Sequence, residues 1–324
     1  MKKILFLLIA ISFNFSGCII FRSDYYIMTD PPMPRKLKEY DPVKAGAEII
    51  ECFDITGKIA FPVENYLFAY DGKMITSNYD LVMYGDSFYI RTENKIYVFN
   101  KNTFAKEKEI TIRFPNGYRH YPEPYQIYRY HGLVIIGDYA IFMCSNEGNR
   151  QFENYLLLID LLSGNTTIFN DEAYLGKNIY NGYSAIIGYD RIHNIFWLIK
   201  RCENWNTNLY LYNYDKATNG IIPYKSVKGC KAGRENYDYP NGLDISGDEI
   251  WYVYNSIPAP NGYIRYVEME KRNINNMDTG LAYINVEYLG TLSMPQSIVY
   301  DKPYIWIMVE RDDQIQMLKL LPNE

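Results

Sequence analysis

Aromatic and basic side chains gather in two loop-like segments of the chain. The first segment supplies the candidate binding residues Tyr118, Arg119, His120, Tyr121, Tyr125 and His131. The second supplies Arg234, Tyr237 and Tyr239. Tyrosine and arginine offer large contact areas and hydrogen bonds at modest entropic cost, which suits recognition of protein, peptide or glycan. The alternative is compositional, because 34 tyrosines are spread over the chain.

Polar residues also stand immediately before several apolar runs that we predict to be innermost strands of a repeated sheet. They are Asp80, His131, Asn181, Asn241 and Gln296. In a ring of such sheets these side chains would surround the mouth of a central channel. They could hold a cation or a polar ligand there, or equally only water.

Motifs of known enzymes are missing from the chain. It has no nucleophile elbow, P-loop, HExxH motif or EF-hand loop, and only three histidines. We therefore predict no catalytic residue and no cofactor. Binding to a phosphate backbone requires clustered positive charge, and the net charge of this chain is −5. We therefore expect no nucleic-acid partner.

The elements that must position these residues form a repeat of about 50 residues. Gly85-Asp86, Gly137-Asp138 and Gly247-Asp248 each separate two apolar runs, and Asp190 and Asp301 continue the series more loosely. A second marker keeps the same period. It consists of three similar runs, at 94–100, 154–160 and 208–214.

This period predicts an all-β chain that folds as a β-propeller. We expect six blades of about four antiparallel strands, with five or seven as alternatives, starting near residues 56, 79, 132, 184, 242 and 296. The last blade has only three strands of its own. A strand at 49–55 would complete it and close the ring, which removes open sheet edges.

Propeller topology divides the connections between two faces. On the turn face, strand one joins strand two and strand three joins strand four; we expect tight turns there, with 270–280 as the exception. On the loop face lie the remaining connections, which include the long segments 114–131, 145–153, 170–183, 225–241 and 255–261. Long loops on a rigid scaffold commonly carry function.

The run Pro240-Asn-Gly-Leu-Asp-Ile-Ser246, followed by the strand-like 248–253, resembles propellers of the NHL and gluconolactonase-like group. In gluconolactonase-like enzymes the asparagine of this motif binds the catalytic metal, so the resemblance makes Asn241 a candidate ligand. The family's other two metal-binding motifs do not occur in this chain. The alternative reading is a turn in which asparagine and glycine supply unusual backbone angles.

The N-terminus has a targeting pattern, with Lys2 and Lys3 before an apolar run too short to span a membrane. The run ends at Phe15-Ser-Gly-Cys18, which resembles the lipobox of bacterial lipoproteins and implies acylation of Cys18. We expect a signal peptide at 1–17, a lipidated, proline-containing tether at 18–47 and a propeller domain at 48–324. The alternative is an ordinary signal with an incidental cysteine.

Four further cysteines are Cys52, Cys144, Cys202 and Cys230. Outside the cytoplasm Cys202 and Cys230 could form a disulfide, or all four could remain free thiols. Together the patterns favour a lipid-anchored binding platform of the cell envelope, at the outer membrane or cell surface. The alternatives are a metal-dependent hydrolase or lactonase with a divalent cation, and a structural subunit of an envelope complex.

Overall fold

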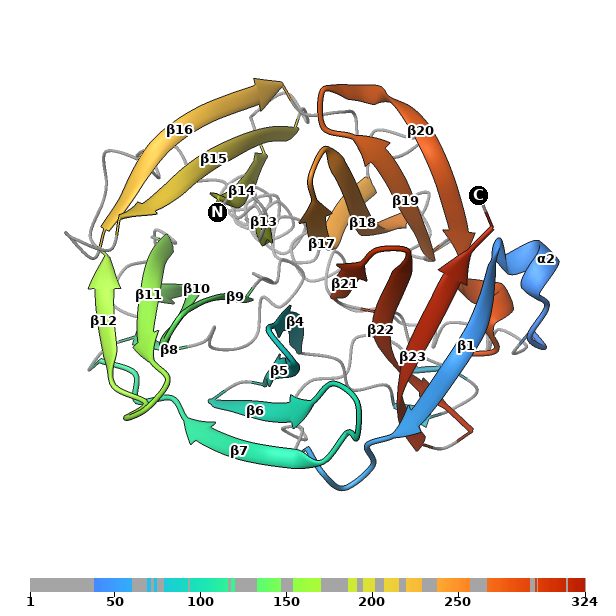
Figure 1. Cartoon of the computed structure of the whole chain (residues 1–324), viewed down its shortest axis with the longest axis horizontal. Coiled ribbons are helices and arrows are strands. Elements are labelled where there is room, and N and C mark those ends of the chain that lie inside the picture. The colour runs from blue at the N-terminus through green and yellow to red at the C-terminus, as the bar shows by residue number, and fades with distance from the viewer. Residues whose placement is uncertain are drawn as a thin grey trace, which may run out of the picture.

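In the computed structural model, five sheets of short antiparallel strands surround a common axis (Figure 1). The structure describes residues 38–59, 69–70, 73–74, 79–92, 94–115, 118–119, 133–146, 154–169, 186–190, 195–201, 207–215, 220–228, 238–256, 267–291, 295, 297–312 and 314–323. The remaining residues, which include the predicted signal peptide and Cys18, lie outside the described part.

Each sheet is one blade, numbered here in chain order. Blade 1 contains β4 (Asp80–Tyr84), β5 (Ser87–Arg91), β6 (Lys95–Asn100) and β7 (Lys106–Thr111). Blade 2 contains β8 (Tyr118–Arg119), β9 (Leu133–Ile136), β10 (Tyr139–Asn146), β11 (Asn154–Asp160) and β12 (Thr166–Phe169). Blade 3 contains β13 (Ile186–Asp190), β14 (Ile195–Arg201), β15 (Thr207–Asp215) and β16 (Gly220–Lys228).

Blades 4 and 5 complete the ring. Blade 4 contains β17 (Asp238–Ser246), β18 (Glu249–Ser256), β19 (Val267–Asn273) and β20 (Asn276–Asn285). Blade 5 contains β21 (Ile298–Asp301), β22 (Tyr304–Arg311), β23 (Gln314–Pro322) and β1 (Ala47–Asp54). Outside the blades lie the hairpin β2 (Ala69–Tyr70) and β3 (Lys73–Met74), the helical turn α2 (Pro42–Ala45) and the 3-10 helix η1 (Val286–Leu289).

The predicted β-propeller is confirmed, and so is its closure by the two ends of the chain. β1 pairs antiparallel with β23, from Ala47 opposite Pro322 to Asp54 opposite Gln316. The inner strands β4, β9, β13, β17 and β21 contact one another in a closed cycle, so the described residues form five blades. Five is one of the two alternatives to the preferred number of six. Of the blade expected from residue 56, the described residues are 56–59 and the β2–β3 hairpin.

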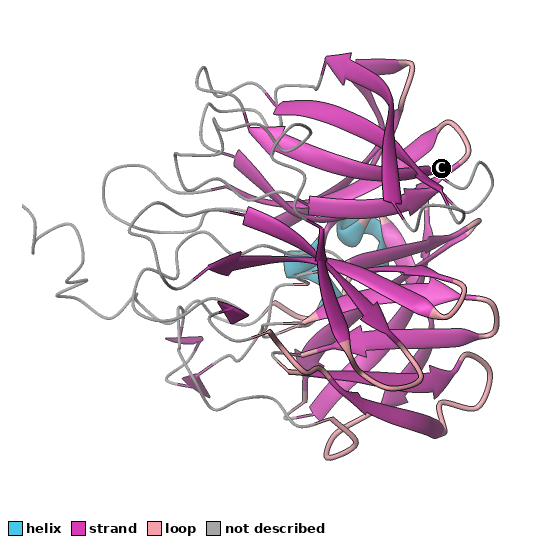
Figure 2. Cartoon of the chain, turned by 90° about the vertical axis from the view of Figure 1, so that its left-hand side faces the viewer, coloured by secondary structure: helices cyan, strands magenta, loops and turns pink. Residues whose placement is uncertain are grey.

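The two repeat markers of the sequence meet on the turn face. The carbonyl of Asp86, in the turn between β4 and β5, accepts a hydrogen bond from Lys101 N at 2.8 Å, directly after β6. Asp138 and Asp248 repeat this contact with the backbone that follows β11 and β19. The glycine before each of these aspartates has a φ near +60°, as the first central residue of a type II′ hairpin turn does. These turns gather at one side of the molecule (Figure 2).

One expectation about the turn face was wrong. Residues 270–280 are no long connection, because β19 runs to Asn273 and β20 begins at Asn276. The two-residue turn between them is held by Ile274 N, which donates to the Asp248 carbonyl at 2.7 Å. The polar residues that suggested a loop therefore belong to the third and fourth strands of blade 4, β19 and β20.

The hydrophobic core lies between neighbouring blades. One cluster joins blades 4 and 5 and includes Trp251, Met269 and Leu318; another joins blades 5 and 1 and includes Trp306 and Phe88. A third joins blades 1 and 2. Blades 1 and 5, which have a cluster on each side, thus bury both faces of their sheets, which explains the nearly continuous apolar runs of their inner strands.

Candidate functional site

Four of the predicted binding residues have a described backbone position, and all four lie at the loop-face end of their blades. In β8, Tyr118 and Arg119 pair with the last two residues of β10, at the end farthest from the turn at Gly137. In β17, Tyr239 and Asn241 lie at the end farthest from the turn at Gly247. The structure therefore brings residues from blades 2 and 4 to one face of the propeller.

The other predicted site residues lie outside the described part of the chain. They are Cys18, His120, Tyr121, Tyr125, His131, Asn181, Arg234, Tyr237 and Gln296, together with Cys202 and Cys230 of the possible disulfide. Their roles remain predictions. The Cys52 side chain is a free thiol at the protein surface, where partial burial raises its pKa.

Asn241 lies within a strand, so the expected turn at this position was wrong. β17 pairs with β18 through Pro240 opposite Tyr254 and Gly242 opposite Val253, which leaves Asn241 as the extra residue of a β-bulge. Bulges bend a strand and re-aim its side chains, and they occur often near binding sites. The asparagine-glycine pair thus interrupts the innermost strand of blade 4 near the loop face.

Asp80 does not line the channel mouth as an open ligand. Its carboxylate is fully buried and forms an ion pair with the guanidinium of Arg91, at the end of β5. The guanidinium carbon lies 4.6 Å from the ring centroid of Phe142, in blade 2. Arg91 is only 2% exposed, so this pair joins blades 1 and 2 within the protein. The sequence analysis missed Arg91, which its position opposite Asp80 in a tight hairpin could have indicated.

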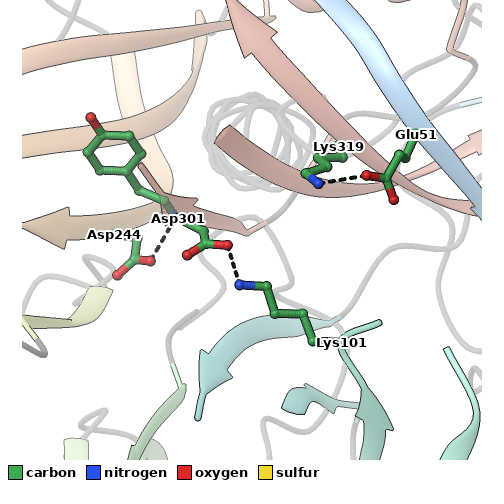
Figure 3. Close-up of polar contacts among 6 residues, drawn as sticks. Glu51, Lys101, Asp244, Asp301 and Lys319 are labelled. Atoms are coloured by element: carbon green, nitrogen blue, oxygen red, sulfur yellow. Dashed lines mark hydrogen bonds and ion pairs between the residues drawn. The ribbon is translucent and has the colours of Figure 1, made fainter. Parts of the chain in front are cut away.

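A second buried carboxylate, Asp244, has a structural role that the sequence analysis also missed. It is the aspartate of the Asn-Gly-Leu-Asp motif, and its Oδ2 accepts a hydrogen bond from Tyr300 N at 2.8 Å (Figure 3). Its Oδ1 accepts one from Ile245 N at 2.9 Å. The motif therefore connects the inner strands of blades 4 and 5. The sequence signal for this role was a charged residue inside the apolar run of an inner strand.

The inner strands have closely packed interiors. In β4, β9, β17 and β21, the interior residues Leu81, Val134, Leu243 and Val299 are all less than 5% exposed. These side chains are packed within the protein and are not available to a ligand.

A charged cluster centred on Glu249 lies on the turn face. Its carboxylate accepts a hydrogen bond from the Tyr300 hydroxyl at 2.5 Å and forms ion pairs with Lys271 and Lys302, both at 3.0 Å. Burial by itself raises the pKa of Glu249, but the hydrogen bonds from Tyr300, Lys302 and Lys271 outweigh it and lower the pKa to about 2. The Glu249 carboxylate thus has its hydrogen-bond and ion-pair partners within the protein, and the cluster connects blades 4 and 5.

Among the described residues, no three His, Cys, Asp or Glu side chains come together in a way that could hold a metal ion. Asn241 is described only as backbone, so its predicted part in metal binding is untested. No helix in the described ranges has the length and apolar character needed to cross a bilayer.

No family model matches the chain, and no curated protein matches it. A glycosyl hydrolase from Bacteroides ovatus is a similar solved structure: 11% identity, TM-score 0.42, over 75% of this chain and 83% of that one. A GH130-family structure, from work on glycoside hydrolases that target β-1,2 mannosidic linkages in Candida mannan, is 10% identical, with TM-score 0.43 over 76% and 84%.

TolB from Acinetobacter baumannii is 13% identical, with a TM-score of 0.35 over 74% of this chain and 53% of that chain. All three TM-scores lie below 0.5, so these similarities carry no argument about activity. The β-propeller assignment stands on the strand pairing described above.

Proposed function

We propose that the chain is a lipid-anchored β-propeller of the cell envelope that binds a protein, peptide or glycan on its loop face. The observation that carries the proposal is the contrast between the two faces. The turn face is closed by short turns hydrogen-bonded to one another. The loop face receives Tyr118, Arg119 and Tyr239 near strand ends and Asn241 in a nearby bulge, from two different blades.

Tyrosine and arginine on a rigid rim can stack on a sugar ring or clasp a peptide with little loss of side-chain freedom. The lipobox-like sequence before Cys18 supplies the anchor, and several acyl chains hold a protein at a membrane far better than one. Anchoring at the outer membrane or cell surface is part of the proposal.

Photo-crosslinking in intact cells tests the binding face. A photoreactive phenylalanine replaces Tyr118 in one variant, Tyr239 in a second and Leu162 in a third, each in the full chain. Leu162 is the control, because it is 85% exposed and lies in the turn between β11 and β12 on the turn face. We expect the same crosslinked species from positions 118 and 239 and none from 162. Crosslinks only from 162 would overturn the assignment of the face.

Because a glycan ligand would give no protein crosslink, the purified full chain is also tested on a glycan array. Loss of glycan binding in Tyr118→Ala and Tyr239→Ala, with retention in Leu162→Ala, would identify the ligand class. The lipid anchor has a separate test, in which cells are labelled with an alkyne fatty acid. Label should be incorporated into the natural chain and lost in Cys18→Ala.

A further inference from the structure

Residues 38–47 were expected to belong to the tether, yet they are packed against the propeller. Asp41 caps the helical turn α2, since its Oδ1 accepts hydrogen bonds from Val43 N and Lys44 N, both at 3.2 Å. Ala45 and Ala47 are completely buried in the core cluster between blades 4 and 5. At the other end of the turn, Gly46 has φ +71° and ends the helix in the left-handed conformation.

The segment is attached to blade 4 through η1. Asp41 N donates to the Tyr288 carbonyl at 3.0 Å, and the Lys38 ammonium pairs with the Glu287 carboxylate. The same ammonium lies 4.3 Å from the centroid of the Tyr288 ring. Gly46 also packs against the backbone of β20 so closely that an added Cβ would lie 2.5 Å from the Tyr283 carbonyl oxygen.

The segment is attached to blade 5 as well. Asn323 N donates to the Gly46 carbonyl at 2.9 Å, and its side-chain amide donates to the Pro42 carbonyl at 3.2 Å. The Tyr40 hydroxyl accepts a hydrogen bond from Ile49 N at 2.8 Å. Residues 38–47 thus connect β1, the end of the chain and the neighbouring blade at the rim of the ring, where Figure 1 places α2.

The strand that closes the ring has weak support of its own. β1 pairs only with β23 among the described strands, and after Ala47 none of its side chains is fully buried. Its ladder is also interrupted between Ile49 and Glu51, where Ile50 forms a bulge. Fraying from the N-terminal end of β1 would open blade 5, in which the first and the last described strands of the chain are paired.

We propose that residues 38–47 act as a clasp that keeps the ring closed by holding the N-terminal end of β1 against blades 4 and 5. Opening of β1 from that end requires the clasp to detach first, because the clasp precedes β1 and is hydrogen-bonded on both sides of it. If the chain is anchored by lipid at Cys18, as under the proposed function, a pull on the tether reaches the clasp before it reaches β1.

Hydrogen exchange measured by mass spectrometry on the purified full chain tests the clasp. Gly46→Ala adds a methyl group against the Tyr283 carbonyl, whereas Gly57→Ala is the matched control. Gly57 has the same φ of +71°, lies just beyond the opposite end of β1 and has no atom within 4 Å of an added Cβ. Both substitutions therefore impose the same backbone penalty, and only one of them disrupts the clasp.

We expect the amides at 47–50 to exchange about tenfold faster in Gly46→Ala than in Gly57→Ala, with the amides of β22 unchanged in both. Equal exchange of β1 in the two variants would overturn the proposal. A uniform increase that includes β22 would also overturn it, because residues 38–47 would then be an ordinary part of the global core.

A milder pair of variants keeps the test decisive if Gly46→Ala fails to fold. Asp41→Ala removes the cap of the clasp, and Asp54→Ala removes a similar cap at the far end of β1, where Asp54 Oδ1 accepts from Thr56 N at 2.8 Å. Only Asp41→Ala should accelerate exchange at 47–50. No partner or lipid is needed for this measurement. The clasp proposal can therefore be overturned while the proposed function stands, and the proposed function can be overturned while the clasp proposal stands.

Discussion

The seams between blades 4 and 5 and between blades 5 and 1 place a tryptophan at the same position of the repeat. Trp251 and Trp306 are each the third residue of the second strand in their blade, and both are buried. Trp306 lies in an aromatic cluster, with ring centroids 4.9 Å from Phe88 and 5.7 Å from Phe104. Trp251 has one described aromatic neighbour, Tyr300, at 6.3 Å.

Charged contacts are distributed in the opposite way. The seam beside Trp251 contains the buried carboxylate of Asp244 and the Glu249 cluster. The seam beside Trp306 is crossed by two buried neutral hydrogen bonds, from the Tyr79 hydroxyl to the Met308 carbonyl and from the Ser297 hydroxyl to the Leu81 carbonyl. Its described ion pair lies at the edge, where Lys101 contacts Asp301 at 2.5 Å (Figure 3). The same repeat position is thus surrounded by aromatic rings in one seam and lies beside carboxylates in the next. The two seams should respond differently to substitution, acid and salt.

The largest expected effect comes from Trp306→Ala, which should lower the free energy of unfolding by about 3–5 kcal/mol, because it leaves a cavity among the rings of Phe53, Phe88 and Phe104. Chemical denaturation followed by circular dichroism measures the change. Trp306→Phe is the companion variant and should cost less, since it keeps an aromatic ring and removes an indole N–H that has no hydrogen-bond partner. An equal loss from both variants would contradict the aromatic explanation.

Asp244→Ala should destabilise the other seam by about 1–3 kcal/mol, because it leaves the buried Tyr300 N–H without the carboxylate that it donates to. The same denaturation experiment measures this loss. Asp248→Ala is a suitable control: Asp248 is exposed, and its described hydrogen bond uses the backbone carbonyl, which the substitution retains. The idea that Asp244 joins two blades fails if the two variants lose the same stability.

Glu249→Gln should destabilise the protein by about 1 kcal/mol near pH 7, a small effect because solvent screens the partly exposed cluster. Folding lowers the pKa of Glu249 from 4.5 to about 2, so the stabilisation is present above pH 4.5 and is lost as the pH falls towards 2. Thermal melts of both proteins between pH 7 and pH 2 should therefore converge in acid. A difference that stays constant over this range would show that the charge of Glu249 is unimportant.

The smallest effect is expected from Lys101→Met, at about 0.2–1 kcal/mol, because both members of the Lys101–Asp301 pair are about a quarter exposed. Added salt should reduce the difference from the natural chain, since screening weakens exposed ion pairs. Lys95→Met is the control, because Lys95 pairs with Glu109 inside blade 1 rather than across a seam. If only Lys95→Met destabilises the protein, the Lys101–Asp301 ion pair contributes no stability to the seam.

Much of the architecture was predictable because short local sequence patterns mark each repeat. The Gly-Asp turns and the third strands kept one period, and the structure shows a reason. In blades 1, 2 and 4 the carbonyl of the turn aspartate accepts a hydrogen bond from the first backbone N–H after the third strand. Closure by a strand at 49–55 followed from counting strands in the last repeat. A further marker was overlooked, since Trp197, Trp251 and Trp306 occupy the same strand position in three successive blades.

The candidate site was less predictable, because its chemistry depends on what surrounds each residue. The sequence by itself determined the all-β repeat, the turn positions and the composition of the loop segments, since these follow from local backbone preferences and alternating polarity. Only the tertiary structure decided that five blades close the ring, that Asn241 forms a bulge, and that Asp80 is neutralised by Arg91. Blade number and the fate of a carboxylate both depend on contacts between segments far apart in the chain, which no local pattern contains.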